Sequence, residues 1–185
     1  MAFVASARAT GLFAVERAGS GGAPRGAVVV MNHVSLIDIC VLLANLPDSV
    51  CVAKASAKRN PFLSAVVRRL FIANDRGWEA TEREARAHLA RGVNVVVFPQ
   101  GTRGGATLHR GAARLALAAG ADLVPYRIAY DPVVLTKGQP WWDVGDKVIR
   151  IRLERGEAIT TAGRSPSRPC AVALTSRIAS AIGLR

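Results

Sequence analysis

Residues 27–38 decide the fold that this sequence predicts, and they read Ala27-Val28-Val29-Val30-Met31-Asn32-His33-Val34-Ser35-Leu36-Ile37-Asp38. The first five residues are small or β-branched and apolar, which is typical of a buried strand, and polar residues follow directly. The arrangement recurs where the apolar run 93–97 leads into Phe98-Pro99-Gln100-Gly101-Thr102-Arg103. Because open α/β sheets bind ligands at the carboxyl ends of their strands, we expect both segments at one ligand-binding edge.

Strand-like and helix-like segments alternate along the rest of the chain. Strands are expected at residues 12–15, 27–31, 51–53, 70–73, 93–98, 122–130 and 148–153, and helices at 35–44, 60–70, 79–91, 111–119 and 169–182. The last strand alternates apolar residues with arginine, which is typical of an edge or half-exposed strand. In the helix 79–91, Ala85, Leu89 and Ala90 are expected to face the core.

This alternation predicts a single α/β domain over residues 1–185, with a central, largely parallel mixed sheet flanked by helices. Residues 18–25, rich in glycine and serine, read as a short linker, and residues 160–185 as a C-terminal linker and helix. Half of the residues are hydrophobic, which is too apolar for a disordered chain.

The composition also argues against a transmembrane helix, a signal peptide, disulfides and a metal site. No apolar run approaches the roughly 18 residues needed to span a bilayer, and residues 1–14 lack a basic leader, so we predict neither a transmembrane helix nor a signal peptide. We therefore expect the chain in the cytoplasm. Its three cysteines show no metal-binding or disulfide spacing, and its three separated histidines suggest no metal site.

The charge is strongly basic. The chain has 25 Lys and Arg residues against 13 Asp and Glu, a formal net charge of +12. Such a surface attracts phospholipid headgroups, nucleotide-like cofactors or nucleic acid, or it is only the solvated surface of an arginine-rich protein. No nucleic-acid recognition motif accompanies the charge, so a nucleic-acid partner is not expected.

His33 and Asp38 form the first candidate for chemistry. In one straight helix five residues turn by about 500°, which would leave the two side chains about 140° apart. They meet only if His33 lies in the turn before the helix and Asp38 on its first turn, with Ser35 as the N-cap. Asp38 would then orient the imidazole, whose other nitrogen takes a proton from a substrate hydroxyl. The alternative is a histidine bonded to backbone, with Asp38 only favouring the helix N-terminus.

The second segment adds groups that suit an anion. Pro99 fixes the chain, and Gly101 lets the backbone approach a ligand closely. Thr102 supplies a hydroxyl, and the Arg103 guanidinium matches the geometry of a phosphate. Alone, such a segment is an ordinary turn. Together with the histidine segment, it predicts a transfer reaction on an anionic substrate.

The two segments resemble the signatures of the glycerophospholipid acyltransferases, the 1-acylglycerol-3-phosphate acyltransferase group. Asn32, His33 and Asp38 match Asn-His-x4-Asp, and residues 98–103 match Phe-Pro-Glu-Gly-Thr-Arg except at Gln100. The resemblance covers about residues 12–160 and implies the sandwich fold of these enzymes. It also implies direct acyl transfer: His33, held by Asp38, deprotonates a lysophospholipid hydroxyl, which attacks the thioester of acyl-CoA or acyl carrier protein. No metal or other cofactor is implied.

The resemblance further assigns roles to the neighbouring residues. It implies phosphate binding by Arg103, Arg76, Thr102, Gly101 and Arg110, and support of the motifs by Asn32, Ser35, Pro99 and Gln100. Arg110 alternatively only caps a turn.

The sequence departs from the family pattern at three places. Gln100 keeps an acceptor and adds a donor but removes the usual glutamate charge, which would change headgroup preference. Residues 71–76 align with the family's Phe-Ile-Asp-Arg in two ways, one that keeps Arg76 and one that places Asn74 there and loses the arginine. The N-terminal membrane helices of many family members are missing.

The expected partners are an acyl thioester, a lysophospholipid and an anionic membrane surface, at whose inner face the chain would lie peripherally. Trp141-Trp142 and residues 60–70 are candidates for that membrane contact, or they pack in the ordinary way. Two alternatives remain for the function: the same chemistry on a lyso-aminolipid or glycolipid, and a catalytically silent, basic lipid-binding module. The oligomeric state is left open.

Overall fold

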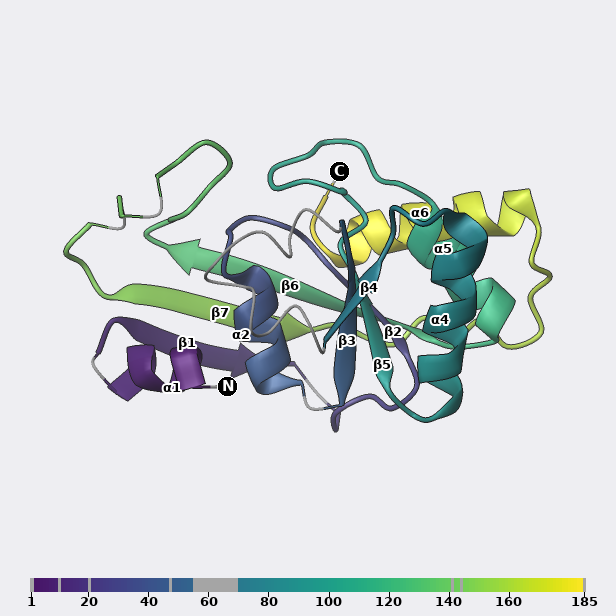
Figure 1. Cartoon of the computed structure of the whole chain (residues 1–185), viewed down its shortest axis with the longest axis horizontal. Coiled ribbons are helices and arrows are strands. Elements are labelled where there is room, and N and C mark those ends of the chain that lie inside the picture. Colours follow the sequence, from purple (N-terminus) through teal and green to yellow (C-terminus); the bar gives the residue numbers. More distant parts are fainter. Residues whose placement is uncertain are drawn as a thin grey trace.

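The computed structural model describes residues 2–9, 11–19, 21–46, 48–54, 70–140, 142–143 and 145–184. Within these ranges the strands form one seven-stranded sheet in the order β1-β7-β6-β2-β5-β3-β4 (Figure 1). The strands are β1 (Phe13–Ala18), β2 (Val28–Met31), β3 (Ser49–Ala53), β4 (Phe71–Ala73), β5 (Asn94–Val97), β6 (Leu123–Asp131) and β7 (Ile149–Arg155). The helices are α1 (Ala2–Ala9), α2 (Asp38–Asn45), α4 (Trp78–Ala90), α5 (Gly111–Ala119) and α6 (Arg168–Ala181).

The sheet is mixed and largely parallel, as predicted. Strands β6 and β7 pair antiparallel, and the other neighbouring strands pair parallel. Strands β2 and β5 lie side by side, with Val30 opposite Val97. Their carboxyl ends therefore meet, and the segments that follow them, residues 32–38 and 98–103, leave the sheet at the same edge.

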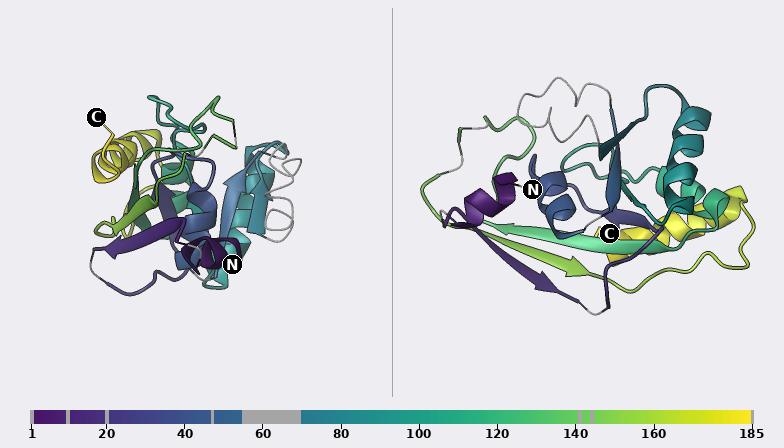
Figure 2. Two further views of the ribbon diagram at one scale, coloured as in Figure 1. Left: turned by 90° about the vertical axis from the view of Figure 1, so that its left-hand side faces the viewer. Right: turned by 60° about the horizontal axis from the view of Figure 1, so that its bottom comes forward.

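Helices cover both faces of the sheet, because its central strands are apolar on both sides. In β2, Val29 and Met31 belong to one core cluster, which also includes Leu42 of α2. The alternate residues Val28 and Val30 belong to a second cluster, with side chains from α4, α5 and α6. Figures 1 and 2 show these three helices gathered at one end of the molecule and α1 near the other.

Several predicted elements need correction. Helix α1 was not predicted, and its Ala7 is buried in the first core cluster. Strand β7 alternates buried and exposed residues as expected but is not an edge strand, because β1 pairs with its outer side. In α4, Ala90 is exposed rather than in the core, since the buried stripe consists of Thr81, Ala85 and Leu89, spaced four residues apart.

Other predictions agree closely with the structure. Helix α5 spans the predicted residues and ends at Gly120, which has a left-handed backbone (φ 61°) that suits glycine. The predicted helix 60–70 lies outside the described residues except for Leu70. No helix in the described part of the chain combines the length and the hydrophobicity needed to cross a bilayer.

Candidate active site

The turn between β2 and α2 brings His33 and Asp38 together. Asp38 is the first residue of α2 and is fully buried. Its Oδ2 lies 2.7 Å from His33 Nδ1 and accepts hydrogen bonds from the backbone N–H groups of Val34 (2.6 Å) and Ser35 (2.9 Å). The predicted geometry, with His33 before the helix and Asp38 on its first turn, is confirmed. The catalytic role of the pair stays a prediction.

Ser35 does not cap the helix, contrary to the prediction. Helix α2 begins three residues later than expected, and Ile37 occupies the N-cap position without a side-chain hydrogen bond to the helix. The Ser35 hydroxyl lies 3.5 Å from the backbone nitrogen of Ile37, inside the turn. The carboxylate of Asp38 takes the turn's N–H donors instead, which is why the turn closes tightly enough for His33 to reach it.

Tyr130 on β6 holds the second oxygen of Asp38. Its hydroxyl donates a hydrogen bond to Asp38 Oδ1 at 2.6 Å. Burial first, and then the charge of Asp38, raise the pKa of Tyr130 well above its ordinary value, so the hydroxyl keeps its proton and donates. Tyr130 was not predicted from the sequence as a site residue. The available signal was the alternation of Tyr126, Ile128 and Tyr130, which places all three on the face of the sheet that α2 covers.

The imidazole of His33 is fixed on several sides. Its ring stacks on Phe98, with centroids 4.3 Å apart and the planes at 29°. Because the Asp38 carboxylate accepts at Nδ1, that nitrogen carries the proton and Nε2 the lone pair. The side chain is 21% exposed and lines a cavity of about 670 Å³, which we call the His33 cavity. The ring therefore has one nitrogen engaged by Asp38, and its side chain borders a space that a ligand could enter.

Gln100 joins the two segments that the sequence singled out. Its Oε1 accepts a hydrogen bond from the backbone N–H of His33 at 2.6 Å, and its Nε2 donates to the Gly105 carbonyl at 2.5 Å. The backbone N–H of Gly104 in turn donates to the His33 carbonyl at 2.8 Å. Gln100 is only 5% exposed, so both ends of its amide serve the protein itself.

Asn32 continues the sheet by one residue beyond β2. Its Nδ2 donates to the Ile128 carbonyl at 2.9 Å, and its Oδ1 accepts from the Ile128 N–H at 2.8 Å. The side chain therefore imitates a strand partner for β6 while the backbone turns away toward His33. This pair of bonds positions the histidine turn above the same part of β6 that carries Tyr130.

Two cations line the His33 cavity. The described residues that form it are Asn32, His33, Val34, Gln100, Arg103, Gly104, Gly105, Ala106, Thr136, Lys137 and Leu184, and none of them is acidic. Arg103 donates from Nη1 to the carbonyls of Leu135 (2.7 Å) and Thr136 (3.0 Å), while Nη2 and Nε carry three further N–H groups. Lys137, from the segment between β6 and β7, was missed by the sequence analysis. A phosphate beside His33 would meet both cations.

The other predicted phosphate-binding residues lie elsewhere. Gly101 (φ 66°) lines a neighbouring cavity of about 300 Å³, together with Pro99, Phe98 and Trp78, which we call the Trp78 cavity. A side chain at residue 101 would crowd His109, because a Cβ there would lie 3.1 Å from its Cδ2. Thr102 is exposed in the turn and, among the described residues, belongs to the lining of neither cavity.

Among the described residues, Arg76 and Arg110 do not belong to the lining of the His33 cavity, and their phosphate binding stays a prediction. Arg76 follows β4, is 62% exposed and forms an ion pair with Glu84 at 2.8 Å. Asn74, the residue of the other alignment, lines the Trp78 cavity. Arg110 precedes α5 and lines a third cavity, between α5 and α6.

Two observations bear on other chemistries. Cys40 is buried on α2, and burial first, then the charge of Asp38, raise its pKa from 9.0 to about 11, so the thiol is protonated and a poor nucleophile at neutral pH. Within the described residues, no three His, Cys, Asp or Glu side chains come together as a metal site would require.

Comparisons with known proteins agree with this architecture. The family model described as Acyltransferase matches residues 14–129, which include both segments of the site. Among solved structures, the chain is similar to the 1-acyl-sn-glycerophosphate (LPA) acyltransferase PlsC from Thermotoga maritima, with a TM-score of 0.63 and 22% identity over 92% of this chain and 73% of that one. At this identity the likeness shows a shared fold. A search of curated proteins found no match.

Proposed function

The chain belongs to the acyltransferase family, and from that premise we propose that it moves a fatty acyl group from a thioester to the free hydroxyl of a lysophospholipid such as 1-acylglycerol-3-phosphate. The observation that carries the proposal is the His33–Asp38 contact of 2.7 Å at the edge of a cavity that also holds Arg103 and Lys137. Together they offer a base and a phosphate site side by side.

In the proposed mechanism His33 acts as the general base. Its Nε2 takes the proton of the acceptor hydroxyl while that oxygen attacks the thioester carbonyl carbon. Asp38 stabilises the imidazolium that forms. The tetrahedral intermediate then collapses, the carbon–sulfur bond breaks, and the leaving thiolate takes the proton from His33. The products are an ester and a free thiol, and the reaction needs no covalent enzyme intermediate.

Phosphate recognition is assigned to Arg103 and Lys137. Both line the His33 cavity, and a guanidinium and an ammonium give a phosphate charge-assisted hydrogen bonds. Gln100 is not assigned to the headgroup, since both ends of its amide are already bonded inside the protein. The cations favour a phosphate-bearing acceptor over an uncharged glycolipid.

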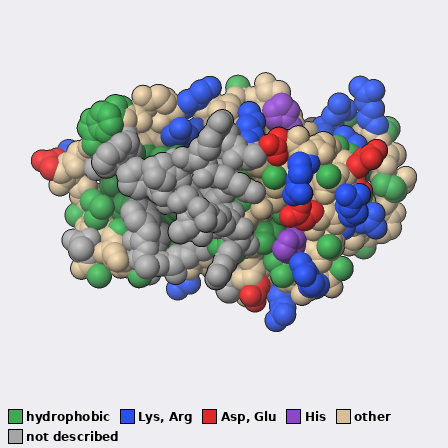
Figure 3. All heavy atoms as spheres, in the orientation of Figure 1, with side chains coloured by type: hydrophobic (Ala, Val, Ile, Leu, Met, Phe, Trp, Pro, Cys, Tyr) green, Lys and Arg blue, Asp and Glu red, His purple; other side chains and the backbone are tan. Residues whose placement is uncertain are grey.

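We further propose that the segment between β6 and β7 rests on an anionic membrane from the cytoplasmic side. Val133, Trp142 and Val148 are 54%, 68% and 53% exposed there, and Lys137 and Lys147 belong to the same segment. Figure 3 shows hydrophobic side chains on the surface at that end of the molecule. An exposed indole suits the lipid interface, while the two lysines are matched in this segment by Asp143 and Asp146. Trp141 lies outside the described residues.

The test is release of free thiol from acyl-CoA by the purified protein in anionic lipid micelles, with and without lysophosphatidate. We expect release that depends on lysophosphatidate and disappears in His33→Ala. The control is His88→Ala, which changes a histidine on the outer side of α4 and should leave turnover unchanged. Near-wild-type turnover in His33→Ala would refute the mechanism. Faster turnover of lyso-aminolipids or glycolipids than of lysophosphatidate would refute the assigned acceptor.

A further inference from the structure

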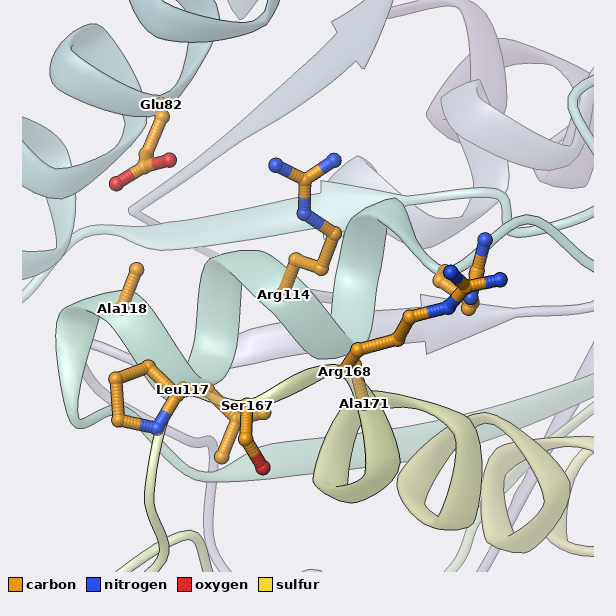
Figure 4. Close-up of a pocket in the computed structure, with 9 residues that line it drawn as sticks. Glu82, Arg114, Leu117, Ala118, Ser167, Arg168 and Ala171 are labelled. Carbon is orange, nitrogen blue, oxygen red and sulfur yellow. The ribbon is translucent and has the colours of Figure 1, made fainter.

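A third cavity, of about 480 Å³, carries an unusual concentration of positive charge. Arg110 and Arg114 reach it from the start of α5, and Arg168 from the first turn of α6. Among the described residues that line it, Glu82 is the single carboxylate. Figure 4 shows Arg114 rising from α5, Arg168 extending from α6, and Glu82 on the opposite wall. We call this site the arginine cavity.

The cavity suits a ligand with several phosphates and an apolar part. Arginine side chains bind phosphate oxygens through their planar N–H groups. The first turn of α6, a helix of 14 residues, adds its own preference for negative charge. The rest of the wall is mostly apolar, formed by Leu117, Ala118, Pro166 and Ala171, with Ser167 as its one further polar residue among those described. Its volume falls in the range of about 300–1,000 Å³ that small-molecule and cofactor sites occupy.

Arg114 is oriented in advance for such a ligand. Its guanidinium carbon lies 4.3 Å from the centre of the Trp78 ring. A cation stacked on an aromatic ring presents its flat face to the ring, and its N–H groups point outward in the guanidinium plane. The side chain therefore loses little freedom when a phosphate binds, which strengthens binding.

The arginine cavity lies next to the Trp78 cavity, which in turn lies next to His33. Glu82 lines the arginine cavity and the Trp78 cavity, and Trp78 itself holds Arg114. The Trp78 cavity is also lined by Phe98, on whose ring His33 stacks. The arginine cavity and the Trp78 cavity are therefore neighbours, and the Trp78 cavity adjoins the ring on which His33 stacks.

From this arrangement we infer that the arginine cavity binds the phosphoadenosine diphosphate end of coenzyme A. This inference rests on the proposed function, because it names the donor that delivers the acyl group. The adenine meets the apolar wall, the phosphates meet Arg110, Arg114 and Arg168, and the pantetheine arm lies along the Trp78 cavity. The acceptor phosphate occupies the separate His33 cavity, so donor and acceptor approach His33 from different sides.

The experiment is calorimetric titration of the full chain with adenosine 3′,5′-bisphosphate, which requires no turnover. We expect binding that weakens about tenfold in Arg114→Gln and in Arg168→Gln, as loss of a charge-assisted phosphate contact predicts. Arg177→Gln is the matched control, since Arg177 lies exposed on the same helix, nine residues beyond Arg168. In steady-state assays the first two variants should raise the KM for acyl-CoA about tenfold, with kcat and the acceptor KM unchanged. Thermal unfolding verifies that each variant is folded.

Several results would overturn the inference. The first is that the bisphosphate does not bind. The second is that it binds Arg168→Gln and Arg177→Gln with equal affinity. The third is that inorganic phosphate binds as tightly as the nucleotide. Transfer from acyl carrier protein but not from acyl-CoA would also overturn it while leaving the acyltransferase function intact. Conversely, nucleotide binding that depends on the arginines in a chain without any transferase activity would refute the proposed function alone.

Discussion

Replacing Tyr130 with phenylalanine tests the arrangement around Asp38 most directly. The change removes one hydroxyl, whose hydrogen bond to Asp38 Oδ1 is 2.6 Å long, and leaves the aromatic ring in place. Hydrogen bonds to charged groups contribute about 1.5–3 kcal/mol to stability. We therefore expect the free energy of unfolding to fall by about 2 kcal/mol, which for a domain of this size lowers Tm by about 4–8 °C.

The same substitution should slow acyl transfer without weakening acceptor binding. Asp38 keeps its bonds to His33, Val34 and Ser35 but loses the donor that holds its other oxygen, so the imidazole is oriented less firmly. We expect kcat to fall about tenfold, equivalent to about 1.4 kcal/mol in the barrier. The KM for lysophosphatidate should not change, because Tyr130 is absent from the described lining of the His33 cavity.

The matched control is Tyr126→Phe on the same strand. Tyr126 is also buried, but its hydroxyl meets Arg155 rather than Asp38. This variant should lose stability and keep its kcat. Thiol release measures kcat, and calorimetry measures Tm. An unchanged kcat in Tyr130→Phe, or an equal loss in Tyr126→Phe, would refute the idea that the tyrosine positions the catalytic pair.

Three further predictions concern Gln100, Asn32 and Cys40. Gln100→Glu should lower the free energy of unfolding by about 1–3 kcal/mol, because a carboxylate cannot donate to the Gly105 carbonyl; an unchanged urea midpoint would contradict this. Asn32→Ala removes both hydrogen bonds to Ile128 and should lower the free energy of unfolding by about 1–3 kcal/mol. It should also remove most of the activity, and full activity in a folded variant would contradict this. Because the pKa of Cys40 is raised from 9.0 to about 11, its contribution of about 3 kcal/mol is present below pH 9 and disappears as the pH rises from 9 to 11. Urea unfolding across this range should therefore show a smaller loss for Cys40→Ala than for the wild type, and parallel losses would disprove the assignment.

The fold could be predicted where local sequence determines it. The apolar runs of β2 and β5 are buried on both faces, which marks central parallel strands, and Gly120 ends α5 where a left-handed residue is needed. The order of the strands could not be predicted in this way. Strand β7 pairs with β6, the strand before it, but its other neighbour is β1, more than a hundred residues earlier in the chain, and no local pattern encodes that pairing.

The site, like the fold, could be predicted where residues near in sequence determine it, but not where distant segments meet. The sequence limited a contact between His33 and Asp38 to one local geometry but left open whether they touch, and the structure shows that they do. Tyr130 and Lys137 follow β2 by about a hundred residues and reach the site only through the pairing of β6 with β2. Arg110 is close to a motif in the sequence, but it lines the cavity between α5 and α6 rather than the His33 cavity, and its place in the sequence could not distinguish the two.

One backbone carbonyl shows why the segment between β6 and β7 matters for the proposed chemistry. The Leu135 carbonyl accepts a hydrogen bond from the Leu36 N–H at 3.0 Å and another from Arg103 Nη1 at 2.7 Å. It therefore ties the histidine turn and the arginine turn to the segment that exposes Trp142 and contributes Lys137. In the proposed function, a lysophospholipid that enters from a membrane at this segment would contact Arg103, Lys137 and His33, which belong to segments held together by these hydrogen bonds. The His33 cavity and the proposed membrane contact thus share the segment between β6 and β7, which contributes Thr136 and Lys137 to the cavity.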